Sequence, residues 1–208
     1  MADQPVSDFP LFPLGIVALP EEVIPLHIFE ERYKTMMNEC IDEEREFGIV
    51  WLSDDGLRDI GCACRIEQVL ERMEDGRMNL LARGTRPIRV LERQSHLAYP
   101  AGIIEYVEDR EDAVDPDLVR GARQAYAELV KRATDREPTE EELADMSAYG
   151  MAATVDFGLD AKQGLLDLRS ENARLRLVAR LFRAAMKRLD FVDRAQARAR
   201  SNGKVRLG

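Results

Sequence analysis

The sequence has few of the residues on which common catalytic and metal sites depend. Its 208 residues include three cysteines and two histidines, too few for a disulfide framework. No pair of C-x-x-C or H-x-x-H motifs completes a zinc site. The loop G-x-x-x-x-G-K-[ST], which holds nucleotide phosphates, is also missing. We therefore expect no metal, no cofactor and no bound nucleotide.

Positive charge is scarce as well. With 30 Lys and Arg against 39 Asp and Glu, the formal net charge is -9, which disfavours nucleic acid, because phosphate binding depends on Lys and Arg. No apolar run approaches the roughly 20 residues that span a bilayer. The N-terminus lacks the basic and apolar regions of a signal peptide. These absences predict a cytoplasmic protein with no membrane partner.

The sequence changes character near residue 110. Before that point, short β-branched segments alternate with turn residues, which predicts strands separated by tight connections. A helix is expected at residues 29–41, and the DG pair at 75–76 predicts a hairpin turn. The predicted strands are 9–20, 23–28, 47–53, 60–73, 78–84, 86–93 and 101–108, with a bend at Gly84.

The segment IPLHIFEERYKTMM joins the second strand to the predicted helix. Ile24 and Leu26 are predicted to face the core, and His27 to face outward. Glu30 and Lys34 have the i,i+4 spacing of a helical ion pair. Helical periodicity predicts an apolar face formed by Phe29, Tyr33, Met36 and Met37.

Helical patterns replace strand patterns after the acidic linker. Asp115 followed by Pro116 predicts the N-cap and first position of a helix that ends near residue 136. Later helices have predicted N-caps at Thr139, Asp160 and Ser170. The stretch after residue 193 is basic and has no large apolar anchor before Val205.

These patterns predict an α+β fold. A mostly antiparallel open barrel with one inserted helix is followed by a C-terminal helical bundle. The predicted boundaries are a disordered N-terminus at 1–8, a β-rich subdomain at 9–109, a linker at 110–116, a helical subdomain at 117–193 and a basic flexible tail at 194–208.

Several motifs resemble one family. The run LFPLGIVALPEEVIPLHIFEERYKTMM at 11–37 is similar to the PL…PG…PLxIFExRY signature of the N-terminal substrate-recognition domain of Lon-type ATP-dependent proteases. The likeness continues at 47–50, 61–92 and 99–109, and more weakly at 160–182. The segment LPEEV departs from the family's Pro-Gly, which affects a turn.

The resemblance implies a PUA-like pseudo-barrel that binds unfolded or exposed polypeptide segments. It also implies neither ATPase nor protease activity, because other domains of Lon proteases carry those functions. We therefore expect a stand-alone recognition domain that serves as an adaptor or holding factor, with a full-length Lon-type protease as a candidate partner.

Other site chemistries have simpler explanations in this sequence. Cys62 and Cys64 fall on the apolar face of one predicted strand, so we interpret them as core residues rather than nucleophiles or metal ligands. Nothing in the sequence brings Cys40 or His27 to them. The paired carboxylates lie at helix N-termini or in loops, where solvent and the helix dipole stabilise them.

A polypeptide-binding surface requires exposed apolar groups or an open sheet edge. We expect it near the groove between the β-rich half and the helices, although each candidate residue alone is more typical of a core. The candidates are Phe9, Phe12, Leu14, Trp51, His96, Leu97, Tyr99, Tyr106 and Tyr149.

Two alternatives remain open at this point. The first is a nucleic-acid-binding module in the PUA-like half, whose best basic stripe is Arg83, Arg86, Arg89 and Arg93. Strand residues at this spacing do not share one face, which weighs against the stripe. The second is a small-molecule enzyme with a pocket that no motif reveals.

Overall fold

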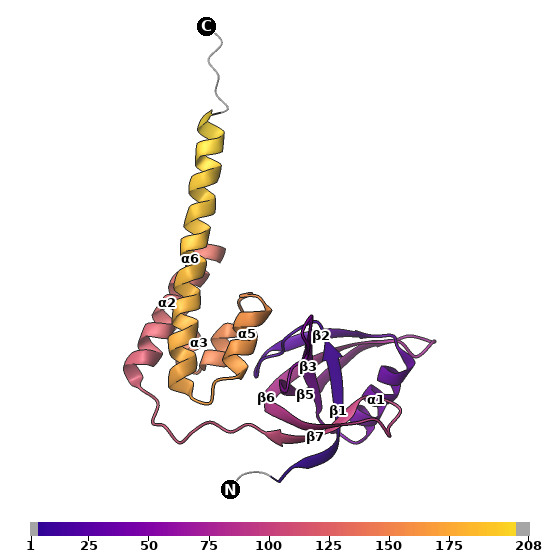
Figure 1. The fold of residues 1–208 in the computed structure, drawn as a ribbon. Helices are drawn as coiled ribbons and strands as arrows, with labels where there is room; N and C mark the ends of the chain where they lie inside the picture. Colours follow the sequence, from indigo (N-terminus) through magenta and orange to yellow (C-terminus); the bar gives the residue numbers. More distant parts are fainter. Residues whose placement is uncertain (1–3, 203–208) are drawn as a thin grey trace.

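The computed structural model describes residues 4–202, with side chains through residue 195. A β barrel lies beside a group of helices, and the extended segment after β7 connects the two (Figure 1). The barrel half contains β1 (Val6–Leu14), β2 (Val23–Ile28), α1 (Glu31–Asp42), β3 (Phe47–Ser53), β4 (Gly56–Leu57), β5 (Ile60–Arg72), β6 (Met78–Gln94) and β7 (Ala101–Tyr106).

Five strands close into a ring. They follow the order β1–β7–β6–β5–β3, and a parallel pairing of β3 with β1 completes the circle. Every other pairing among the described residues is antiparallel. Outside the ring, β2 pairs with the first half of β6, and β4 pairs with the end of β3. The predicted α+β fold with a mostly antiparallel barrel and one inserted helix is confirmed.

The ring has its own small hydrophobic core. Successive side chains of a strand point to opposite faces, and one buried cluster draws residues from all five ring strands. Contact among all five strands on one face is possible only inside the closed ring, so this cluster fills the barrel. Its members are Phe9, Leu11, Val50, Ala63, Ile88, Val90 and Ile104.

The predicted break at Gly84 is wrong, because β6 runs through it as one strand. Cys64 pairs with Gly84 and Ala63 pairs with Arg86, so Thr85 is the extra residue of a β-bulge. A β carbon on Gly84 would lie 2.0 Å from the carbonyl oxygen of Leu19. The glycine therefore permits a close backbone approach rather than a bend.

The helix α1 begins two residues later than predicted. Ile24 and Leu26 are buried, and so are Tyr33, Met36 and Met37, as expected. Phe29 instead precedes the N-cap Glu30 and is 59% exposed, so its predicted place on the buried helix face is wrong. The predicted Glu30–Lys34 pair is also wrong: Lys34 Nζ bonds Glu31 at 2.8 Å, while Glu30 pairs with Arg32.

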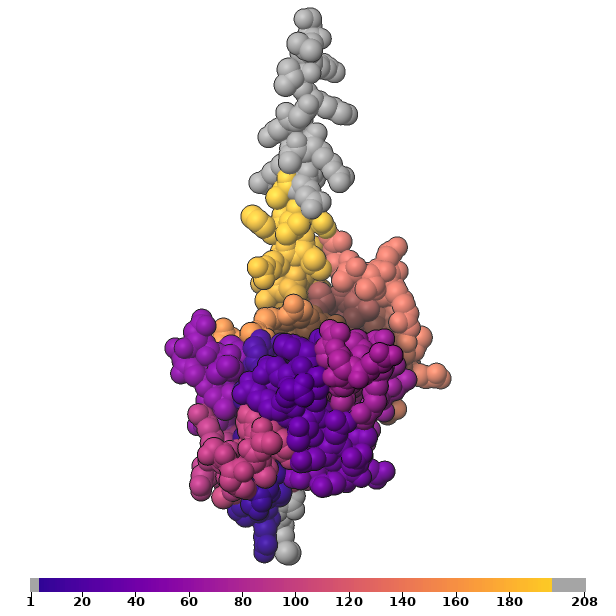
Figure 2. All heavy atoms as spheres, turned by 90° about the vertical axis from the view of Figure 1, so that its right-hand side faces the viewer, coloured from indigo at the N-terminus to yellow at the C-terminus, as the bar shows by residue number. Residues whose placement is uncertain are grey.

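The helical half is dominated by two long helices that pack together, α2 and α6, and α6 projects beyond the body of the protein (Figure 2). No helix within residues 4–202 is both long and apolar enough to cross a membrane. The helices are α2 (Pro116–Thr134), α3 (Glu140–Ala144), α4 (Ala148–Ala152), α5 (Leu159–Leu166) and α6 (Glu171–Asn202).

Some predicted helix caps hold and others do not. Asp115 caps α2, and Thr139 with Glu142 forms the predicted capping box of α3. The Ser170 hydroxyl accepts a hydrogen bond from the Ala173 amide at 3.4 Å. Asp160 is not a cap: α5 begins at Leu159 after an N-cap at Gly158. Sequence periodicity did not reveal α4, which is too short to show a period.

Several element boundaries also differ from the prediction. The strand β1 begins at Val6, so residues 6–8 of the predicted disordered N-terminus belong to a strand. Val6 pairs with Ile104 of β7, and the register shifts between Val6 and Phe9. The helix α2 takes in Pro116, the last residue of the predicted linker. The predicted flexible tail begins as helix, since α6 continues to Asn202, and 203–208 lie outside the described residues.

The two halves share one main hydrophobic core, which contains Phe12 and Leu80 of the barrel together with Leu129 and Phe182 of the helices. Polar contacts reinforce the joint. The Gln163 amide donates to the Ile60 carbonyl at 3.1 Å, and Lys162 pairs with Glu22. The helical half is therefore fixed to the barrel rather than tethered by the linker alone.

The buried side chain of Arg174 ties the linker to this joint. It is 4% exposed, and its guanidinium bonds Asp109, Glu171 and the Leu168 carbonyl. The same group lies 4.5 Å from the ring centroid of Tyr149. Burial is the largest single influence and lowers the pKa of Arg174, but the hydrogen bond to Asp109 and the charge interactions with Tyr149, Asp109 and Glu171 together outweigh it, so the pKa lies above its ordinary value.

Candidate polypeptide-binding groove

Four of the residues predicted to bind polypeptides are buried. Phe9, Phe12, Tyr99 and Tyr149 are 4%, 5%, 4% and 6% exposed. Phe9 lies inside the ring, and the Tyr99 hydroxyl donates to Glu39. The Tyr149 hydroxyl donates to the Leu165 carbonyl at 3.2 Å. In this conformation these side chains stabilise the core, and Phe12 alone of the four also borders a surface groove.

The other predicted residues are scattered. Leu14, Trp51 and Leu97 are partly buried against the main core. Tyr106 packs against the ring interior and has the Arg86 guanidinium 3.4 Å from its ring centroid. His96 is exposed and pairs with Asp8 at 2.9 Å. The structure brings only Phe12 and Leu14 of the predicted set to one groove.

That groove lies on the barrel, not between the two halves as predicted. Its volume is about 760 Å³. Three stretches supply most of its lining, namely β1, the joint between β2 and α1, and the β3–β4 hairpin, and Arg93 of β6 and Pro100 complete it. The apolar lining side chains are Phe12, Pro13, Leu14, Ile28, Phe29, Tyr33, Leu52, Leu57 and Pro100.

Two large apolar side chains stand exposed at the groove. Phe29 is 59% exposed at the joint, and Leu52 is 52% exposed on the hairpin. An apolar residue before an N-cap often packs on the fourth helical residue, but here that residue is Lys34. Phe29 instead stacks on the His27 ring, with ring centroids 5.8 Å apart. The local structure thus leaves most of this ring available to a partner.

The charged groups that border the groove have partners of their own. Arg32 bonds Glu30 at 2.8 Å, and its guanidinium lies 4.6 Å from the Tyr33 ring centroid. Arg93 donates to the Leu57 carbonyl at 3.2 Å. Burial raises the pKa of the Tyr33 hydroxyl, with Arg32 opposing and Glu30 adding to the shift. The groove therefore offers apolar contact area and no ionised nucleophile.

An open sheet edge lies next to the groove. The strand β2 pairs with β6 on one side and with no other strand of residues 4–202. Glu21 and Glu22 exchange backbone hydrogen bonds with Gly84, which places Ile24, Leu26 and Ile28 in the bonded positions opposite β6. The backbone groups of the alternate residues face the open side, where Pro25 has no N–H to lose.

The cysteines are not poised for chemistry. Cys40, Cys62 and Cys64 are free and buried. Burial raises the pKa of the Cys40 thiol to about 12, and it raises that of Cys62 well above its ordinary value. A protonated thiol is a poor nucleophile and a poor metal ligand. No group of three or more His, Cys, Asp or Glu in the described part of the chain is arranged to hold a metal ion.

The predicted basic stripe does not form a free cationic surface. Arg83 bonds Glu67 at 3.0 Å, and Arg89 bonds Glu105 at 2.9 Å. Arg86 lies over the Tyr106 ring and Arg93 bonds the hairpin backbone. These arginines are held by neighbours on the barrel, so their positions give no support to phosphate binding.

Most of the chain matches one family model, that of the ATP-dependent protease La (LON) substrate-binding domain, over residues 8–183. The chain belongs to this family. A LON substrate-binding domain was the resemblance inferred from the motifs, and that inference is confirmed. Over 190 residues the chain is 27% identical to a Lon protease of Anaeromyxobacter dehalogenans (strain 2CP-C), an alignment that covers 83% of this chain and 22% of that protein.

Solved structures of LON N-terminal domains have the same fold. A Lon N-terminal domain protein from Xanthomonas campestris is 25% identical, with a TM-score of 0.62 over 82% of this chain and 96% of that one. The N-terminal domain of a Mycobacterium avium complex Lon protease is 18% identical, with a TM-score of 0.66 over 84% and 97% of the two chains. The second likeness concerns the fold alone.

Proposed function

We propose that this chain is a non-catalytic domain that binds polypeptide segments with exposed apolar side chains, and that the barrel groove is the site. The observation that carries the proposal is the pair Phe29 and Leu52, which expose more than half of their surface beside paired charges. Covering one such side chain contributes about 1–2 kcal/mol. Membership of a substrate-binding domain family supports polypeptides as the ligand class.

The open edge of β2 supports an extended form for the bound segment. A chain lying along β2 makes main-chain hydrogen bonds that do not depend on sequence, while its alternate side chains meet the apolar groove. This combination suits a domain that accepts many unfolded segments. We propose that it acts as an adaptor or holding factor, with a full-length Lon-type protease as a partner.

The buried thiols support two further parts of the proposal. Free cysteines are stable in reducing compartments, which favours the cytoplasm. Burial also keeps the thiols of Cys40 and Cys62 protonated, which disfavours nucleophilic catalysis by either one. We expect purified protein to hydrolyse neither ATP nor peptides. Hydrolysis that copurifies with the protein, and that is absent from a mock preparation of the same host without the protein, would contradict this.

The test compares binding of a reduced, carboxymethylated model protein, which cannot fold, with binding of its native form. We expect the chain to retain the unfolded form only. The double substitution Phe29→Ser and Leu52→Ser should weaken retention about thirtyfold or more, because two apolar contacts of about 1–2 kcal/mol each are lost. Binding is measured by fluorescence anisotropy of the labelled model protein.

The matched control replaces two apolar residues of similar exposure outside the groove. Leu91 and Val114 are 48% and 49% exposed, and neither lines the groove. Leu91→Ser with Val114→Ser should leave retention unchanged. Equal losses in the two double variants would mean that general surface hydrophobicity, and not the groove, binds the polypeptide.

A further inference from the structure

A second pocket lies on the helical half, between α2 and the first part of α6. It has a volume of about 520 Å³ and a floor of small or aliphatic side chains from both helices, namely Leu118, Ala122, Leu175 and Ala179. A β carbon added at Gly121 would meet nothing within 4 Å. The two helices therefore leave open space above an apolar floor.

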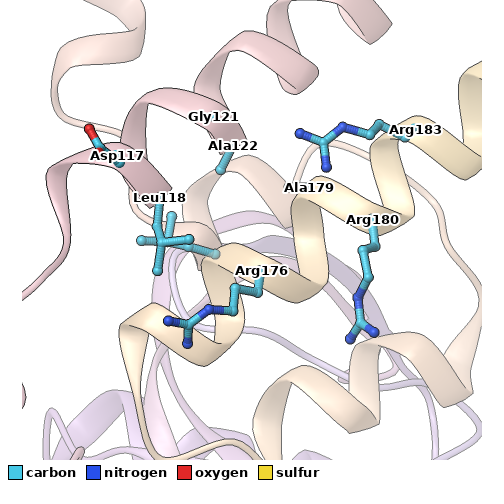
Figure 3. A pocket seen from close by; sticks show the side chains of 9 residues that line it. Asp117, Leu118, Gly121, Ala122, Arg176, Ala179, Arg180 and Arg183 are labelled. Carbon is cyan, nitrogen blue, oxygen red and sulfur yellow. The ribbon is translucent and has the colours of Figure 1, made fainter.

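Three arginines of α6 border this pocket. Arg176, Arg180 and Arg183 are exposed, and none forms an ion pair among the described side chains. In Figure 3 the guanidinium groups of Arg176 and Arg183 reach toward α2 from either end of the floor, while Arg180 turns another way. Seven residues correspond to about 10.5 Å along a helix. Two cations thus flank an apolar floor about two helical turns long.

The charge around the pocket limits what fits there. Although the chain has a net charge of -9, three arginines of α6 border this pocket, and none of them pairs with a carboxylate among the described side chains. At the α2 end, the acidic segment EDREDAVD at 108–115 precedes the rim residue Asp117 and repels a long polyanion, even though Asp109 pairs with Arg174 and Asp117 pairs with Arg120. The lining holds no aromatic ring on which a base could stack. These features favour a short acidic ligand over nucleic acid.

We propose that the α2–α6 pocket binds an acidic polypeptide segment in which carboxylates flank an apolar side chain. The apolar side chain occupies the floor beside Gly121, and the carboxylates pair with Arg176 and Arg183. Arg and carboxylate form charge-assisted hydrogen bonds in a fixed geometry. This surface is separate from the barrel groove and does not depend on the function proposed for that groove.

The probe is a labelled peptide with two glutamates seven positions apart and leucine between them, in an otherwise Ala-rich helical sequence. The control peptide has lysines in place of the glutamates. We expect anisotropy to show binding of the acidic peptide only, weakened as salt rises to about 0.5 M because the charges are screened. Arg176→Glu with Arg183→Glu should weaken binding at least about tenfold.

Two matched variants separate the pocket from its surroundings. Lys187→Glu with Arg194→Glu makes the same change in charge on the same helix outside the pocket, and should leave binding largely intact. Gly121→Leu fills the open space with a better helix former and should block binding while the protein stays folded, as checked by circular dichroism.

Three results would overturn the proposal. One is equal loss of peptide binding in the two charge-reversal variants. Another is tighter binding of a single-stranded oligonucleotide than of the acidic peptide, abolished by Arg176→Glu with Arg183→Glu. The third is a dimer in sedimentation velocity that Gly121→Leu converts to monomer, because a second copy would then be the occupant.

Discussion

The barrel and the helical half offer partners surfaces of different chemistry, and they differ in how tightly their backbones pack. On the barrel, large apolar side chains stand exposed and the neighbouring charges are paired. Between α2 and α6 the floor consists of leucine and alanine side chains, and the bordering arginines have no carboxylate partners among the described side chains. At Gly84 of the barrel, the Leu19 backbone leaves no room for a β carbon, whereas a β carbon at Gly121 of α2 would face open space. The barrel thus presents an apolar groove, and the α2–α6 helix pair presents a charged one.

The largest expected effect comes from Gly84→Ala. Its β carbon would lie 2.0 Å from the Leu19 carbonyl oxygen, so either β6 or the segment leading to β2 must move. We expect a loss of about 3 kcal/mol or more in the free energy of unfolding, measured by urea denaturation. A change below about 0.5 kcal/mol would show that the barrel is as yielding as the helical half.

Arg174→Met should have the next largest effect, because it removes the guanidinium that joins α6 to the linker. Its hydrogen bonds to partly exposed Asp109 and to Glu171 predict a loss of about 1.5–3 kcal/mol in unfolding free energy. Arg176→Met, two residues away and exposed, is the control and should change stability by less than about 0.5 kcal/mol. Similar losses of unfolding free energy in the two variants would show that Arg174 makes no special contribution to the stability of the joint.

Gly121→Ala should have a smaller effect of opposite sign. Alanine is favoured over glycine in a helix interior by about 0.5–1 kcal/mol, and the new methyl group meets no atom within 4 Å. We expect the midpoint of urea unfolding to rise by the corresponding amount. Destabilisation would mean that the space above the α2–α6 floor is less open than described, and would remove the contrast with Gly84.

The two surfaces should also respond differently to salt. Retention of an unfolded model protein at the barrel groove should change little as salt rises to about 0.5 M, because apolar burial dominates there. Acidic-peptide binding at the α2–α6 pocket should weaken severalfold over the same range. Parallel anisotropy titrations check this, and matching salt slopes would contradict the assignment of distinct chemistries.

Sequence patterns predicted the architecture well, because alternation and helix caps are local signals. They failed where a long-range contact decides the structure. Gly84 was interpreted as a bend, since the sequence does not show that the Leu19 backbone approaches it. The merger of two predicted strands into β6 depends on the Thr85 bulge, which has no sequence signature of its own.

The candidate groove was harder to predict than the fold. Phe9, Phe12, Tyr99 and Tyr149 were predicted to bind polypeptides because they are aromatic. A hydrophobic core also requires large rings, and all four are buried in the core. Phe29 was missed because its spacing from Tyr33 matched the helix face. One signal was present: Lys34 at the fourth helical position gives a residue before the N-cap no apolar partner.

Photocrosslinking identifies the residues that contact a bound polypeptide, and it shows whether unfolded polypeptides bind at Phe29 and Leu52. A photoreactive amino acid is placed at position 29, or at exposed Val114 as the control, and the protein is irradiated with a carboxymethylated model protein. We expect abundant adducts from position 29, few from position 114, and loss of the adducts at position 29 when Leu52→Ser is added. Equal crosslinking from the two positions, or none from position 29 while binding persists, would contradict binding at Phe29 and Leu52.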